Sequence, residues 1–240
     1  MIPKIIHYCW FGRGEKPKLA KKCIESWKKY CPDYDVVEWN EDNYDVHKNP
    51  YTEYCYQNRK WAYLSDFVRL DVVAEHGGIY FDTDVELLRS PDFLLDREAF
   101  FCYETPDFVA TGLGFGAQAR HRTVTAMRQL YLDRQPNASG AMELVGCPRL
   151  NTQALQQLGF VPDGKQAVVE GAVILPADYM NPMNSATGTI TRTNNTFSIH
   201  RYTMSAQSPK QRLISTLSRP LHRLFGADSL SSLKKLLHMN

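Results

Sequence analysis

Two aspartates, separated by a single threonine, follow a short apolar segment of the chain. Ile79-Tyr80-Phe81 reads as a β-type run, and Asp82-Thr83-Asp84 comes directly after it. Two like charges at the end of a buried strand are unfavourable unless a positive group joins them. Mg²⁺ and Mn²⁺ are divalent cations that prefer oxygen ligands. The sequence therefore predicts that Asp82 and Asp84 hold one of these cations.

A second polar pair lies upstream, in the segment Ser65-Asp66-Phe67-Val68-Arg69. Residues at the spacing of Asp66 and Arg69 share one face of a helix. Such a pair is either an ordinary ion pair on a helix surface or part of a binding site. The acidic pair that follows shortly afterwards favours the binding site.

Together these residues resemble the signature of glycosyltransferase family 32, in which S-D-x-x-R precedes G-G-x-Y-x-D-x-D. The matching positions are Ser65, Asp66, Arg69, Gly77, Gly78, Tyr80, Asp82 and Asp84. The family includes bacterial capsule and lipopolysaccharide sugar transferases and yeast Golgi mannosyltransferases, and is distantly similar to the clostridial glucosylating toxins. The resemblance extends from Ile2 to about Gly116.

The resemblance implies an α/β protein with a GT-A-type nucleotide-diphospho-sugar transferase fold, a Rossmann-like mixed sheet flanked by helices. The expected enzyme is a retaining, Mn²⁺- or Mg²⁺-dependent glycosyltransferase. It would move a hexose or N-acetylhexosamine from a nucleotide-sugar donor, expected to be UDP-linked. The acceptor would be a glycan, free or linked to a polyprenyl diphosphate, in capsule or O-antigen synthesis. No isolated carboxylate stands out as a nucleophile, so the resemblance implies front-face attack.

The resemblance also implies roles for the first group of site residues. Asp66 would accept hydrogen bonds from the donor sugar, and Arg69 would fix that sugar or the β-phosphate. Asp84 would hold the metal, with Asp82 bridged to it through water, and Tyr80 would line the donor pocket. Trp10, at the end of the first strand, is either a core aromatic or the residue that stacks on the nucleobase, and the resemblance favours stacking.

Further candidates lie toward the C-terminus. Gly112 and Gly114, in the segment TGLGFG at 111–116, are expected on a strand whose edge faces the acceptor. His200 would complete the metal's coordination or hold the diphosphate, unless it is a half-buried structural histidine. Arg201 would reach the same diphosphate. The chain departs from the family after His200, where the expected tryptophan is absent.

The flanking segments supply the elements that must position these residues. Apolar periodicity predicts a strand at 2–11, a helix at 18–30 and a strand at 34–39, forming a right-handed β-α-β unit with parallel strands. The long helix from Trp61 is expected to end at Gly77-Gly78, since glycine accepts the left-handed conformation common at helix ends. Further helices are predicted at 50–58, 123–132 and 151–158, and further strands at 79–81, 85–88, 99–103, 168–169, 173–175 and 197–200.

Composition is that of an ordinary globular protein, with 43% apolar and 22% charged residues in a chain of 240. No apolar run is long enough for a membrane helix, and the N-terminus does not resemble a signal peptide. The six cysteines include no C-x-x-C and are expected to be reduced. We expect a cytoplasmic protein without a nucleic-acid partner, with a catalytic domain at 1–205 and a tail at 206–240.

Two other functions remain open from the sequence. The apolar run followed by D-x-D also fits a haloacid-dehalogenase phosphatase, in which Asp82 would be the nucleophile. That motif normally lies on the first strand, however, and no downstream pair of aspartates is present to bind magnesium. The chain could also be a catalytically silent module that binds a sugar nucleotide.

The tail carries six basic residues and a single acidic one, together with two sets of leucines at helical spacing. A basic amphipathic pair of this kind is typical of segments that lie on a membrane surface. The enzyme would then be peripheral on the inner face of the cytoplasmic membrane. The same apolar faces could instead pack on the catalytic domain or on a second subunit.

If the tail binds a membrane, the full-length protein should bind anionic liposomes in a salt-sensitive manner, because each basic residue near such a surface contributes on the order of 1 kcal/mol. A protein truncated at Ser208 should stay folded and lose this binding. Full-length protein that ignores anionic liposomes, or a truncated protein that unfolds, would show that the tail is structural.

Overall fold

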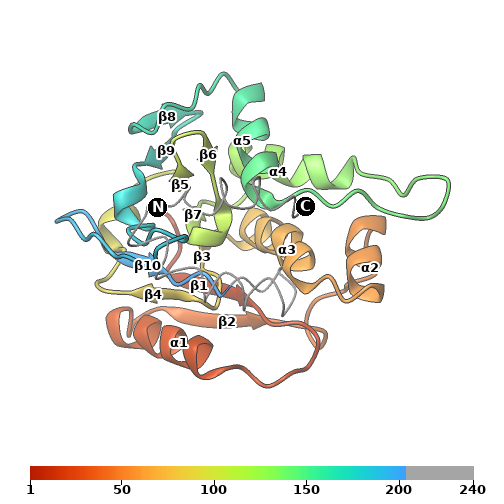
Figure 1. Cartoon of the computed structure of the whole chain (residues 1–240), viewed down its shortest axis with the longest axis horizontal. Helices are drawn as coiled ribbons and strands as arrows, with labels where there is room; N and C mark the ends of the chain where they lie inside the picture. The colour runs from red at the N-terminus through yellow and green to blue at the C-terminus, as the bar shows by residue number, and fades with distance from the viewer. Residues whose placement is uncertain (204–240) are drawn as a thin grey trace, which may run out of the picture.

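A mixed β-sheet forms the centre of the computed structural model, which describes residues 1–203 of the chain (Figure 1). Its strand order is β2-β1-β3-β7-β5-β9-β8, and β6 pairs with β5. The strands are β1 (Ile5–Cys9), β2 (Asp35–Trp39), β3 (Gly78–Tyr80), β5 (Ala99–Thr105), β6 (Phe108–Val109), β7 (Phe115–Ala117), β8 (Ala167–Val169) and β9 (Ala172–Leu175). A second sheet pairs β4 (Val85–Leu87) with β10 (Ser198–His200) in antiparallel fashion.

The predicted mixed α/β architecture is confirmed. Strand β1 pairs in parallel with both β2 and β3, whereas β7 is antiparallel to its neighbours β3 and β5. The helices are α1 (Lys18–Tyr30), α2 (Pro50–Gln57), α3 (Trp61–His76), α4 (Arg122–Leu132) and α5 (Cys147–Gln157). Short 3-10 turns are η1 (Asp92–Leu94), η2 (Thr111–Leu113) and η3 (Ala177–Tyr179).

Two hydrophobic clusters form the core. One lies under α2, α3, α4 and α5 and contains Tyr80, and the other lies toward α1 and the small sheet and contains Ile79 and Phe81. This division follows from strand geometry, because successive side chains of a strand point to opposite faces of the sheet. The segment that ends at the two aspartates is therefore anchored in both clusters.

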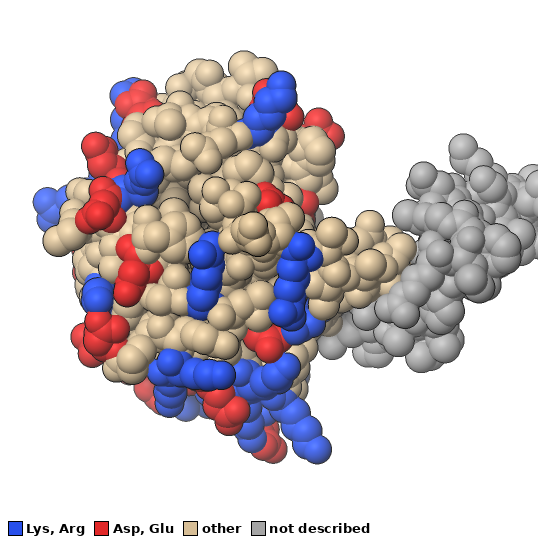
Figure 2. All heavy atoms as spheres, turned by 90° about the vertical axis from the view of Figure 1, so that its left-hand side faces the viewer, with Lys and Arg blue, Asp and Glu red and all other residues tan. Residues whose placement is uncertain are grey.

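Helix α1 connects the large sheet to the small one. Its Trp27 is fully buried, and the Trp27 indole nitrogen donates a hydrogen bond of 2.7 Å to the carbonyl oxygen of Val85 in β4. The opposite side of α1 carries exposed lysines. Figure 2 shows lysine and arginine side chains gathered along the lower edge of the molecule, where α1 lies, with acidic side chains among them. This face therefore carries charges of both signs.

Helix α3 ends where the sequence predicts. Gly77 follows its last residue with a φ of +67°, in the region that favours glycine, and its N–H donates to the Val73 carbonyl at 2.9 Å. A β-carbon at Gly77 would lie 2.9 Å from the backbone nitrogen of Ala119, so the turn also needs a residue without a side chain. This tight turn directs the chain from the helix straight into β3.

The strand expected at 111–116 is wrong in its extent, because only its last part is a strand. Residues 111–113 form the 3-10 turn η2, and β7 begins only at Phe115. The Thr111 hydroxyl is hydrogen-bonded to the Asn151 side chain of α5 at 2.8 Å, and Gly114 has a φ of +113°. The segment leaves the extended conformation at Gly114 and bends there before it enters the sheet. The two-residue strand β6 was not predicted.

The six cysteines are buried and free, as the sequence predicts. Within residues 1–203, no helix combines the length and the apolar character needed to cross a lipid bilayer. The predicted amphipathic tail at 206–240 lies outside the described residues.

Asp71, on α3, is a buried carboxylate that joins three parts of the chain. It accepts a hydrogen bond of 2.7 Å from the Tyr44 hydroxyl, and it pairs with Lys48 at 2.5 Å and with Arg128 of α4 at 3.0 Å. Its side chain is only 6% exposed. This carboxylate therefore ties the segment after β2 and helix α4 to α3.

Asp71→Asn should lower the free energy of unfolding by about 3 kcal/mol, because it leaves two cations and a hydroxyl without their shared carboxylate. Urea denaturation measures this change. Asp33→Asn is the control, since it breaks only the exposed pair with Lys4 and should change stability little. Equal effects of the two substitutions would contradict the structural role of Asp71.

Candidate active site

Arg69 is the buried centre of the site. Its side chain is 2% exposed, and its Nη2 atom lies 3.0 Å from Oδ1 of Asp66 and 3.0 Å from Oδ1 of Asp82. The guanidinium also donates to the Ser65 carbonyl at 3.1 Å and to the Ser65 hydroxyl at 3.2 Å. The S-D-x-x-R segment and the first aspartate of D-x-D thus belong to one hydrogen-bonded unit. Arg69 fixes the positions of both carboxylates.

Tyr80 also holds Asp82. The Tyr80 hydroxyl donates a hydrogen bond of 2.9 Å to Oδ1 of Asp82, and the Arg69 guanidinium lies 5.0 Å from the centre of the Tyr80 ring. Tyr80 is 1% exposed, so it lies behind Asp82. Oδ1 of Asp82 is therefore occupied by Arg69 and Tyr80. Asp82 remains the most open acid of the group, with 27% of its side chain exposed.

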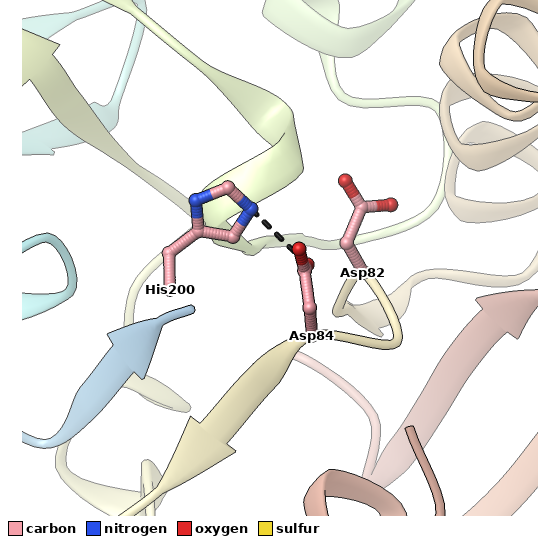
Figure 3. Close-up of side chains that lie close together, drawn as sticks. All are labelled: Asp82, Asp84 and His200. Atoms are coloured by element: carbon pink, nitrogen blue, oxygen red, sulfur yellow. Dashed lines mark ion pairs between the residues drawn. The ribbon is translucent and has the colours of Figure 1, made fainter. Parts of the chain in front are cut away.

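Asp84 and His200 form the second half of the site. Nε2 of His200 lies 3.1 Å from Oδ1 of Asp84, and Oδ2 of Asp84 accepts hydrogen bonds of 2.8 Å from the backbone nitrogen and the hydroxyl of Thr203. Figure 3 shows the His200 ring directed toward Asp84, with the Asp82 carboxylate beside them. Ligand atoms of Asp82, Asp84 and His200 all lie within 4.8 Å of one another.

The small sheet explains how a residue so distant in sequence reaches this site. His200 is opposite Val85 in the antiparallel pairing of β10 with β4, and Asp84 immediately precedes Val85. The Arg201 backbone nitrogen then donates to the Asp84 carbonyl at 2.9 Å. Pairing with β4 therefore places the imidazole beside the second aspartate.

Burial and nearby charges set the protonation of these groups. Burial raises the pKa of Asp66 to about 6, although the Arg69 charge opposes this shift. Burial likewise raises the pKa of Asp82 against the effect of Arg69. Burial acts in the same direction on Asp84, but His200 and the Thr203 hydrogen bonds outweigh it and lower the Asp84 pKa. Burial would lower the pKa of His200, yet Asp84 outweighs it and raises that pKa.

The residues present fit a divalent cation. Two carboxylates and one imidazole offer oxygen and nitrogen ligand atoms of the kind that divalent metals bind. Asp66, Asp82 and Asp84 also bring more negative charge to this region than Arg69 and His200 can balance. The buried Nδ1 atom of His200 has no hydrogen-bond partner within residues 1–203. The other ring nitrogen, Nε2, lies 3.1 Å from Oδ1 of Asp84 and is the one directed at the two carboxylates.

Gly112 lies near Arg69 and Asp82. Trp10 lies at the end of β1, at the same edge of the sheet as the two aspartates that follow β3. The partly exposed Trp10 follows β1, where its indole nitrogen donates to the Gly14 carbonyl at 2.6 Å and Lys16 lies 5.6 Å from its ring. A β-carbon on Gly112 would lie 2.8 Å from Oδ2 of Asp82 and 3.2 Å from Nη1 of Arg69. Gly112 therefore lies directly against the site. Nucleobase stacking by Trp10 stays a prediction.

Gly114 and Arg201 have other surroundings. A β-carbon on Gly114 would lie 2.5 Å from the Phe81 ring and 2.7 Å from Met180, in the hydrophobic core. The Arg201 guanidinium pairs with Glu86 on the small sheet. The predicted contacts of Gly114 with the acceptor and of Arg201 with the diphosphate stay predictions.

Three residues of this region were missed by the sequence analysis. Cys147, at the start of α5, accepts a weak hydrogen bond from Arg69 at 3.7 Å, and Thr203 donates hydrogen bonds to Asp84. Burial raises the pKa of Glu104, near the end of β5, against the opposing effect of the His200 charge. Each is far from the D-x-D segment in sequence, and no local pattern identifies it. Only the pairing of strands and the packing of α5 bring them here.

Replacing Gly112 by alanine should displace the Asp82 carboxylate, because the new β-carbon would lie too close to it. The carboxylate end can move, so we expect the free energy of unfolding to fall by only about 1 kcal/mol. The affinity for Mn²⁺, measured by calorimetry, should fall at least about tenfold. Gly14→Ala is the matched control, because its β-carbon would meet nothing within 4 Å. Unchanged Mn²⁺ affinity in Gly112→Ala would contradict this arrangement.

Comparison with known proteins identifies the same region. Residues 17–101 match the family model described as a glycosyltransferase sugar-binding region containing a DXD motif. The chain is 31% identical over 127 residues to inositol phosphoceramide mannosyltransferase 3 of Schizosaccharomyces pombe, a match covering 48% of this chain and 33% of that protein. This chain therefore spans about a third of the length of that relative.

Two further comparisons cover more of the chain. It is 24% identical over 193 residues to an uncharacterized glycosyltransferase of Acanthamoeba polyphaga mimivirus, with 77% of each protein covered. The structure is similar to that of the PaToxG glycosyltransferase, with a TM-score of 0.51 and 18% identity over 65% of this chain and 69% of that one. Residues 17–101 are thus similar to the DXD-containing sugar-binding region of glycosyltransferases, and the chain has a GT-A-type fold.

Proposed function

We propose that this protein is a metal-dependent, retaining glycosyltransferase that takes a hexose or N-acetylhexosamine from a nucleotide-sugar donor. The observation that carries the proposal is the joining of Asp66, Arg69 and Asp82 through ion pairs of 3.0 Å, beside Asp84 and His200. All but His200 belong to the region that matches the sugar-binding family model. The acceptor is a glycan, in the synthesis of a surface polysaccharide.

Each residue of the site has a distinct task in this proposal. Asp82, Asp84 and His200 would hold the divalent cation. When bound, the cation neutralises charge that develops on the leaving diphosphate. Asp66, which is 8% exposed, accepts hydrogen bonds from donor-sugar hydroxyls. Arg69 is deeply buried and paired with both carboxylates, so it keeps Asp66 and Asp82 at a fixed separation.

The position of the D-x-D segment disfavours the phosphatase alternative. The nucleophilic aspartate of such phosphatases normally follows the first strand, whereas Asp82 follows β3, the third strand along the chain. Oδ1 of Asp82 also accepts hydrogen bonds from Arg69 and Tyr80. The comparisons with glycosyltransferases also support sugar transfer.

The donor is expected to be UDP-linked. The name of the fission-yeast relative, a mannosyltransferase, makes GDP-mannose the alternative donor to test. A panel of UDP- and GDP-sugars with Mn²⁺ separates the two, because the true donor raises the melting temperature by mass action. The same panel should include a phosphomonoester as a substrate for the phosphatase alternative.

Asp84→Asn should abolish Mn²⁺-dependent hydrolysis of the donor while the protein remains folded, because the substitution removes a charged ligand. Release of the nucleoside diphosphate measures the activity, and circular dichroism checks the fold. Asp96→Asn, at an exposed position, is the control and should retain full activity. Full activity in Asp84→Asn, or undiminished activity in a chelator, would refute the proposed metal dependence.

Trp10→Ala should weaken UDP binding by about 1–3 kcal/mol, the range found for stacking of a base on an aromatic side chain. Trp10→Phe keeps an aromatic face and should recover most of the affinity. Calorimetric titration with UDP measures both variants. A loss of stability in Trp10→Ala with unchanged UDP affinity would identify Trp10 as a core residue only.

A further inference from the structure

Two adjoining hollows lie along α5, outside the cluster of acidic residues. Their volumes are about 450 Å³ and about 410 Å³, within the range of small-molecule sites. Phe108 and Arg149 line both hollows, so the two form one continuous surface. We call this surface the α5 groove and define it by Phe108, Gly146, Arg149, Gln153 and Gln156.

The α5 groove begins next to the candidate active site. Gly146 lines it, and the next residue, Cys147, accepts a hydrogen bond from Arg69 at 3.7 Å. From there α5 continues to Gln157, with β6 beside it (Figure 1). A molecule in the groove would therefore lie along α5, whose first residue contacts Arg69.

Both walls of the α5 groove are held in place. The Val109 backbone nitrogen of β6 donates to the Thr152 hydroxyl of α5 at 2.9 Å. The Asn151 side chain binds the Thr111 hydroxyl of η2, the turn that contains Gly112. Helix α5 therefore holds both the groove and the turn that lies against the acidic cluster. A site that positions a second substrate requires such a fixed geometry.

The side chains of the groove are suited to a neutral sugar. Phe108 is 40% exposed, a large apolar ring that is open to solvent. Arg149 is exposed and forms no ion pair within residues 1–203, and exposed Gln153 and Gln156 add amide donors and acceptors. A pyranose presents a C–H face that packs on an aromatic ring and hydroxyls that bond to such polar groups.

The charges favour a neutral ligand over an anionic one. Glu143 and Asp107 line the two hollows and would repel a phosphate or a carboxylate. Glu143 is partly balanced by Arg134 at 3.6 Å, whereas Arg149 remains available for hydroxyl groups. A nucleobase is expected elsewhere, at Trp10 beyond β1.

We infer that the α5 groove binds a neutral sugar ring of the acceptor glycan, with Phe108 packed on its C–H face and Arg149 bonded to its hydroxyls. This inference rests on the proposed glycosyltransferase function. It assigns acceptor recognition to α5 and to β6, separately from the donor residues on α3 and after β3. Neither Phe108 nor Arg149 touches the acidic cluster, so they affect acceptor binding alone.

The test uses methyl glycosides of galactose, glucose, mannose and N-acetylglucosamine as probes for the full-length protein. Saturation-transfer NMR at millimolar concentration detects their binding. At least one glycoside should bind, and Phe108→Ala should weaken that binding about tenfold, as for the loss of one anchoring aromatic residue. Arg149→Gln should weaken it as well. Phe93→Ala is the matched control, because Phe93 is 45% exposed on η1, away from the groove.

Donor hydrolysis in the absence of acceptor is measured on the same variants and should stay unchanged. Transfer to the bound glycoside should fall with the loss of binding. Equal glycoside binding by Phe108→Ala and the parent protein, or no binding of any probe, would overturn the inference. Failure of the proposed function would appear differently, because the parent protein would then not turn over the donor. The glycoside-binding measurement does not depend on donor turnover, so the two failures can be distinguished.

Discussion

A buried guanidinium with two carboxylates on a single nitrogen is the interaction on which the site depends. Arg69 is 2% exposed, and its Nη2 atom lies 3.0 Å from both Asp66 and Asp82. A charge so far from water requires partners, and removing one partner from a buried pair is strongly destabilising. The conformation of the D-x-D turn is therefore coupled to that of helix α3. The same coupling keeps two acids close together, which the protein interior otherwise disfavours.

A second constraint comes from the small sheet. Pairing of β10 with β4 places His200 beside Asp84, and α1 stabilises β4 through the Trp27 hydrogen bond to Val85. Helix α1 thus contributes to a site that its own residues do not reach. The two halves of the acidic cluster have different supports, since Asp82 depends on α3 and Asp84 depends on β10. A cation would join them.

Helix α5 connects this cluster to the surface proposed for the acceptor. Its first residue, Cys147, contacts Arg69, and its Asn151 holds the η2 turn that brings Gly112 against Asp82. Donor and acceptor regions would then be fixed by one element. Because transfer between two substrates requires a defined relative geometry, this shared support is consistent with the proposed function.

The sequence by itself determined most of the elements and the first half of the site. Helical periodicity located α1 and α3, Gly77-Gly78 located the end of α3, and the compound motif identified Asp66, Arg69, Asp82 and Asp84 as one group. These signals are local, because each lies within a short stretch of the chain, the longest being the motif from Ser65 to Asp84. The family resemblance also named His200 as a candidate ligand, but only the pairing of β10 with β4 shows how it reaches Asp84. Tertiary structure alone decided the rest. Cys147 reaches Arg69 through helix packing, and Gly114 turns toward Phe81 because η2 bends the chain. Such contacts join segments far apart in the chain, and no spacing within the sequence encodes them.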